Sequence, residues 1–94
     1  LYNNKLLFMN INELIVIVKS KIEAEIAMQY FKIEDKSFLH KNHKGNQEGM
    51  FHIKLIIKSE ELKKLSKIES TKKIYNILDV ELKEHIHSIQ ILLS

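Results

Sequence analysis

The stretch FHIKLIIK at residues 51–58 decides the fold of this chain. Apolar and polar side chains alternate along it, which is the pattern of a β-strand with one buried face. The apolar positions are Phe51, Ile53, Leu55 and Ile57. His52 falls on the polar side of this alternation, and we therefore interpret it as a surface residue.

Helical and strand patterns flank this strand on both sides. Ahead of it, apolar residues recur every three or four positions behind Asn12, a favourable helix N-cap. Behind it, Ser66 and Glu69 have the S-x-x-E spacing of a capping box that begins another helix. In chain order the sequence predicts a helix over 13–29, a strand over 31–35, the strand over 51–58, a helical turn from 59, a helix over 67–83 and a strand over 85–92.

This order, α-β-β-α-α-β, predicts an α/β (α+β) fold with a three-stranded mixed sheet and helices packed on it. The first two strands are joined by one loop and most simply pair antiparallel. The second and third are joined through helices and, as neighbours, would pair in parallel. The loop then lies at the end of the sheet where both of these strands begin. We expect this edge to bring together four histidines, namely His40, His43, His85 and His87.

Neutral imidazole is a good ligand for zinc, copper or iron, so these histidines are candidate metal ligands. Alternation along the last strand places His85 and His87 on the same face as Ile89 and Ile91, which we expect to be the core face. His87 would then lie at the rim of the core. Two alternatives stay open, namely a solvated loop that happens to carry histidines and a histidine held in the core for structural reasons.

The composition limits what the chain can do. Its 94 residues suffice for one domain, which we assign to residues 11–94 behind a flexible leader at 1–10. The absence of Cys excludes disulfides, a thiol nucleophile and a self-contained iron–sulfur site. No Ser–His–acid set or pair of carboxylates stands out, so we predict that the protein is not an enzyme. No apolar stretch approaches membrane-spanning length, and we expect a cytoplasmic protein.

All 15 basic residues are lysines, and 12 acidic residues leave a formal net charge of +3. Five lysines cluster on the predicted helix pair, namely Lys63, Lys64, Lys67, Lys72 and Lys73. They are a candidate docking patch for nucleic acid or for an acidic partner. The alternative is a solvated helix surface, because Glu60, Glu61 and Glu69 lie close by in the sequence.

Several segments together resemble BolA-like proteins. Residues 36–40 and 51–57 resemble the E-S-x-x-H … H-F-x-V-x-V-V stretch of the family, and residues 62–65 are similar to its F-x-G-L turn. The E-L at 81–82 matches the end of the family's second long helix, and residues 86–89 resemble its V-H-A-L signature. The protein is identified as a divergent, minimal member of this family.

The resemblance implies a fold akin to a type II KH domain and a protein that works through a partner. BolA-like proteins pair with monothiol glutaredoxins and share a bridged [2Fe–2S] cluster with the glutaredoxin and glutathione, which supply the thiolates. The signature histidine and a loop histidine of the family correspond to His87 and His40, with His43 as the alternative loop ligand. The implied role is cluster trafficking or iron-linked regulation, with no cluster bound by this chain alone.

Some BolA-like proteins are described as DNA-binding transcriptional regulators, which is the second interpretation. The KH-like fold and the Lys-rich helix favour it. The absence of Arg argues against it, because Arg is the best bidentate reader of guanine. The family's Arg-His pair at the start of the long helix is also replaced, by Ser70 and Thr71.

Overall fold

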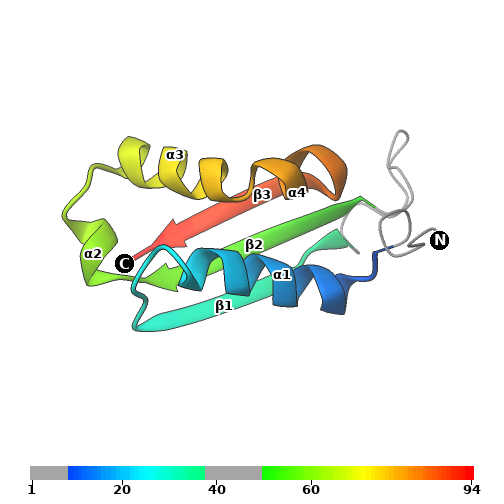
Figure 1. Cartoon of the computed structure of the whole chain (residues 1–94), viewed down its shortest axis with the longest axis horizontal. Coiled ribbons are helices and arrows are strands. Elements are labelled where there is room, and N and C mark those ends of the chain that lie inside the picture. The colour runs from blue at the N-terminus through cyan, green and yellow to red at the C-terminus, as the bar shows by residue number, and fades with distance from the viewer. Residues whose placement is uncertain (1–8, 38–49) are drawn as a thin grey trace.

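The computed structural model describes residues 9–37 and 50–94, and its helices cover one face of a three-stranded sheet (Figure 1). In chain order the elements are α1 (Ile11–Glu23), β1 (Tyr30–Asp35), β2 (Phe51–Lys58), α2 (Glu60–Lys63), α3 (Lys67–Ile77), α4 (Asp79–Glu84) and β3 (Ile86–Leu93). The predicted mixed fold and element order are confirmed, with the predicted second long helix divided into α3 and α4.

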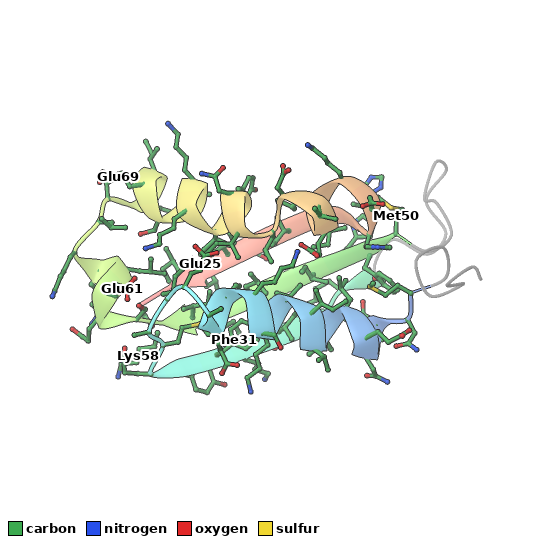
Figure 2. The ribbon with its side chains drawn as sticks, viewed as in Figure 1. Glu25, Phe31, Met50, Lys58, Glu61 and Glu69 are labelled. Carbon is green, nitrogen blue, oxygen red and sulfur yellow. The ribbon has the colours of Figure 1, made fainter. Side chains whose placement is uncertain are left out.

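The sheet has the order β1-β2-β3, with β1 antiparallel and β3 parallel to the central β2, as the connections predicted. Strands β2 and β3 begin at the same end of the sheet, where the N–H of Phe51 donates to the carbonyl of His85 over 2.9 Å. Met50, labelled in Figure 2, lies at this end beside the turn from α4 into β3. We call this end of the sheet the histidine end and define it by Phe51, His52 and residues 85–88.

Helix α1 begins at Ile11 because Asn10 and Glu13 form a capping box ahead of it. The Asn10 side chain accepts from the N–H of Glu13 over 2.8 Å, and the Glu13 carboxylate accepts from the N–H of Asn10 over 3.2 Å. The prediction of Asn12 as the cap was therefore wrong, since a Glu three residues after Asn10 selects that residue. The helix ends at Glu23, earlier than predicted. The predicted helix was too long because the apolar spacing continues into the turn that follows α1.

The predicted helix over 67–83 is interrupted at Leu78. The φ and ψ angles of Leu78 are −99° and 20°, outside the helical region, while its side chain is completely buried. The capping box of Ser66 and Glu69 is confirmed at the start of α3, with hydrogen bonds of 3.0 and 3.1 Å. Because Leu78 stays in the core at the bend, the apolar period of the sequence did not reveal the break.

The core lies between the sheet and the helices. Its buried apolar side chains are Met9, Leu14, Val18, Ile22, Ile26, Ile53, Leu55, Ile57, Leu62, Ile74, Leu78 and Ile86. Met9 belongs to this core and Asn10 caps α1, so packed residues precede the domain start that we placed at residue 11. None of the helices in the described ranges is long and apolar enough to cross a membrane.

A buried carboxylate joins α1 to α4. The side chain of Glu81 is 6% exposed, and its Oε2 lies 2.7 Å from the Nζ of Lys21. The Oε1 of Glu81 has no hydrogen-bond partner among the described residues. Because burial of an unpaired carboxylate is unfavourable, Lys21 supports the packing of α4 against α1.

Lys21→Met is expected to lower the free energy of unfolding by about 1–3 kcal/mol, because Glu81 loses its cation while staying buried. The double change Lys21→Met/Glu81→Leu is expected to recover most of that loss, since apolar replacement of both charges is often nearly neutral. Urea denaturation followed by circular dichroism measures both values, with Lys19→Met on the exposed side of α1 as the control. A double variant as unstable as the single one would contradict this role for the ion pair.

Candidate functional site

The parallel pairing of β2 with β3 contains one extra residue, His87. Phe51 pairs with Ile86, but the next residue, His52, pairs with Ser88, so one step along β2 matches two steps along β3. Such a bulge breaks the alternation of side chains and re-aims the extra residue. Accordingly, Ile86 is buried in the core and His87 is exposed.

The ring of His87 lies against the ring of His52. The two ring centroids are 4.8 Å apart, and the ring planes are tilted by 39°. The Nδ1 of His52 and the Oγ of Ser88 are separated by 2.7 Å, a hydrogen bond whose donor depends on the tautomer of His52. We call His52, His87 and Ser88 the histidine cluster. In it, β3 holds the His52 ring through Ser88, and the His52 ring in turn supports the His87 ring.

The prediction of His52 as a surface residue was wrong. Although His52 lies on the face of the sheet opposite the helices, it is only 5% exposed. Its N–H donates to the Oγ of Ser37 over 3.1 Å, and its carbonyl accepts from the N–H of Lys36 over 2.7 Å. The alternation therefore predicted the correct face of the sheet for His52, but it did not reveal the contacts that His52 makes with Ser37, His87 and Ser88.

The prediction that His85 and His87 share the core face with Ile89 and Ile91 was also wrong. The bulge shifts the alternation by one residue, so that Ile89 and Ile91 pack against the core and His87 does not. His85 is the residue that caps the C-terminus of α4, and it is 7% exposed. Of the two, His87 is the one that a partner can reach.

His40 and His43 lie outside the described residues, so their assignment as ligands stays a prediction. The described residues that flank their segment are Ser37 and Met50. Ser37 contacts the backbone of His52, and Met50 directly precedes β2. Both flanking residues therefore lie at the histidine end of the sheet.

The histidine cluster can supply part of the ligand set of a metal site, but not a complete set. Within the described ranges, no group of three or more His, Cys, Asp or Glu side chains could hold a metal ion. The exposed imidazole of His87 can supply a nitrogen ligand, which iron accepts. Since the sequence contains no Cys, any thiolates must come from another molecule.

The model of the BolA-like protein family matches residues 22–94. The chain belongs to the BolA-like family. This BolA-like protein is 32% identical over 73 residues to the DNA-binding transcriptional regulator BolA of Haemophilus influenzae, a match that covers 78% of this chain and 68% of the relative.

Solved BolA structures share the fold of this BolA-like protein. The BolA domain of SufE1 from Arabidopsis thaliana superposes with a TM-score of 0.71 and 28% identity, over 84% of this chain and 87% of that one. BolA1 from Arabidopsis thaliana superposes with a TM-score of 0.70 and 24% identity, over 82% of this chain and 85% of that one. The predicted resemblance to the family is thereby confirmed.

Ion pairing divides the five candidate docking lysines of this BolA-like protein into two groups. Lys63 pairs with Glu60 at 3.3 Å, and Lys73 pairs with Glu61 at 3.2 Å. A hydrogen bond from the Ala27 N–H and the nearby Lys73 hold the pKa of Glu61 below its usual range. In the part of the chain that the structure describes, the lysines without an ion pair include Lys64, Lys67 and Lys72.

Ser88→Ala is expected to lower the free energy of unfolding by about 0.5–1.5 kcal/mol, because the buried His52 loses a hydrogen-bond partner. The ring resonances of His87, followed by NMR, should shift as well, since β3 no longer holds the ring that His87 contacts. Gln90→Ala, at an exposed position of the same strand, is the control and should change stability by less than about 0.5 kcal/mol. Equal effects of the two changes would remove Ser88 from the histidine cluster.

Proposed function

We propose that this BolA-like protein is a non-enzymatic partner of a monothiol glutaredoxin in the trafficking of a [2Fe–2S] cluster or in iron-linked regulation in the cytoplasm. His87 donates an imidazole nitrogen to a shared cluster. The glutaredoxin and glutathione supply the thiolates that a chain without Cys lacks. The observation that carries the proposal is the exposed His87 at the bulge, with its ring against the buried His52.

His52 and Ser88 contribute by restricting the ring of His87. A side chain that is held in place before binding loses less rotamer freedom when it becomes a ligand. Partners behind a metal-binding imidazole also orient its ring. A [2Fe–2S] cluster with imidazole ligands on one iron has a higher reduction potential than one held by thiolates alone. The chain's own role is therefore to present a nitrogen donor at a fixed place on its surface.

His40 is the proposed second ligand, and His43 is the alternative. Both belong to the segment between Ser37 and Met50, and these two flanking residues lie at the histidine end. An imidazole from this segment together with His87 would give a pair of nitrogen ligands, as in Rieske-type centres. The position of the flanking residues supports this assignment.

Mixing the protein with a monothiol glutaredoxin, iron, sulfide and glutathione under anaerobic conditions is expected to give a mixed complex. Its visible circular dichroism spectrum should differ from that of the glutaredoxin homodimer. His87→Ala is expected to abolish the mixed-complex spectrum, because the cluster loses a ligand, while the far-ultraviolet spectrum stays unchanged because His87 is exposed. Gln90→Ala should leave both spectra unchanged.

The same experiment tests the ligands one by one. His40→Ala and His43→Ala, compared singly, identify the loop ligand as the residue whose loss alters the mixed-complex spectrum. An unchanged spectrum in His87→Ala would remove His87 from the site. If the wild-type mixture shows only the homodimer spectrum and no mixed complex elutes, the partnership itself is wrong.

DNA-binding regulation is the second candidate function. The name of the Haemophilus influenzae relative favours it, and so do the three docking lysines that form no ion pair in the described ranges, Lys64, Lys67 and Lys72. The absence of Arg weighs against sequence-specific binding, because lysine is a poorer bidentate reader of guanine.

Binding of duplex DNA is expected to be weak, with a dissociation constant of about 10⁻⁴–10⁻⁶ M at physiological salt. If the three lysines without ion pairs make the phosphate contacts, the logarithm of the association constant should fall against the logarithm of salt concentration with a slope no steeper than about −3. Fluorescence anisotropy over a salt series measures both values. Tight, sequence-selective binding that persists in His87→Ala would instead make DNA regulation the main function.

A further inference from the structure

The outer face of α3 carries an apolar seam edged by lysines. Ile68 is 69% exposed and Tyr75 is 42% exposed. Their spacing of seven residues is close to two helical turns, so the two side chains lie in line along the helix. Together with their neighbours they line a hollow on the surface. We call this set the α3 seam, which consists of Lys67, Ile68, Thr71, Lys72, Tyr75 and Asn76.

The opposite face of α3 performs the packing, so the seam is not needed to hold the helix in place. Ile74 is completely buried, and Ser70 is 1% exposed. The Oγ of Ser70 donates to the carbonyl of Leu62 over 3.1 Å, which joins α3 to α2. Two large apolar side chains aligned on the exposed face are therefore a candidate interaction surface.

The seam is positively charged and has no acidic residue of its own. Lys67 and Lys72 have no carboxylate partner in the described part of the chain. Glu69, labelled at the start of α3 in Figure 2, is engaged in the helix cap. Hydrogen bonds from the backbone and the side chain of Ser66 hold the pKa of Glu69 below its usual range. A partner that binds the positively charged seam is therefore expected to carry negative charge.

We propose that the α3 seam docks an acidic amphipathic helix of a partner protein. Aliphatic side chains of that helix would lie between Ile68 and Tyr75, and carboxylates along its flanks would meet Lys67 and Lys72. This interaction is independent of the histidine cluster, so it holds or fails separately from the proposed cluster ligation.

Two other occupants fit the seam less well. In a symmetric contact with a second copy of this chain, the same patch faces itself, which brings Lys67 and Lys72 of both copies together. A nucleic-acid backbone would engage the lysines, but it would leave Ile68 unused and would find one stacking platform, Tyr75. An acidic amphipathic helix uses both the apolar and the charged parts of the seam.

The probe for this proposal is a fluorescein-labelled designed peptide of about four helical turns. It carries Leu along one face, with the i, i+3, i+4 and i+7 spacing, and Glu along both flanks. One control peptide has Lys in place of each Glu, and another has Ser in place of each Leu. Fluorescence anisotropy is expected to show binding of the acidic Leu peptide and at least about tenfold weaker binding of both controls.

Substitutions on two helices locate the binding surface. Ile68→Ser, Tyr75→Ser and Lys72→Glu are each expected to weaken binding of the acidic Leu peptide by about tenfold. Val16→Ser and Lys19→Glu change an exposed apolar and an exposed charged residue on α1. These matched controls should alter the dissociation constant by less than about twofold, since they lie on another helix.

Several outcomes would overturn the proposal. One is no binding of the acidic Leu peptide at about 1 mM, and another is equal loss of binding in the α1 and α3 variants. A third is tighter binding of a DNA oligonucleotide that falls in Lys72→Glu but not in Ile68→Ser, which would assign the surface to nucleic acid. A concentration-dependent dimer in sedimentation that Ile68→Ser dissociates would assign it to a second copy. His87→Ala should leave peptide binding unchanged.

Discussion

The extra residue in the parallel pairing of β2 with β3 is the constraint on which the candidate site depends. In a strand that alternates without interruption, His87 would lie on the same face as Ile89, and both side chains would face the core. The bulge lets Ile86 and Ile89 both face the helices while His87 is left at the surface. The same local geometry places Ser88 opposite His52, where its hydroxyl can hold the buried imidazole. One backbone irregularity thus creates both the exposed donor and the support behind it.

Two features that depend on local chemistry were predictable from the sequence, and two features that depend on packing were not. The strand over 51–58 follows from the alternation of apolar and polar residues, and the start of α3 follows from the capping box of Ser66 and Glu69. The break at Leu78 was not predictable, because the residue stays apolar and buried on both sides of the bend. The bulge at His87 has no local signature either, since a register shift becomes visible only when two strands are paired. For the same reason, sequence reasoning missed His52 and Ser88, whose roles depend on their contact across two strands.

The two surfaces of the protein that carry candidate functions are separate. The histidine cluster lies where β2 and β3 begin, whereas α3 begins at the opposite end of the molecule (Figure 1). The seam residues Ile68 and Tyr75 are exposed on α3. The composition restricts the chemistry that both surfaces can supply. A chain without Cys can supply no thiolate to a cluster, and a chain without Arg presents the point charges of Lys instead of bidentate guanidinium groups.

The most direct test of cluster ligation is pulsed electron paramagnetic resonance on the reduced mixed cluster, with the histidines of this chain labelled with ¹⁵N and the glutaredoxin unlabelled. Coordination by His87 predicts a strongly coupled ¹⁵N signal from a directly bound imidazole in the wild-type complex, whereas His87→Ala should form no mixed cluster and therefore give no such signal. The signal should remain in Gln90→Ala, which changes the same strand without removing a ligand. A reduced mixed cluster that shows no strongly coupled ¹⁵N would mean that this chain donates no nitrogen, which would contradict the proposed function.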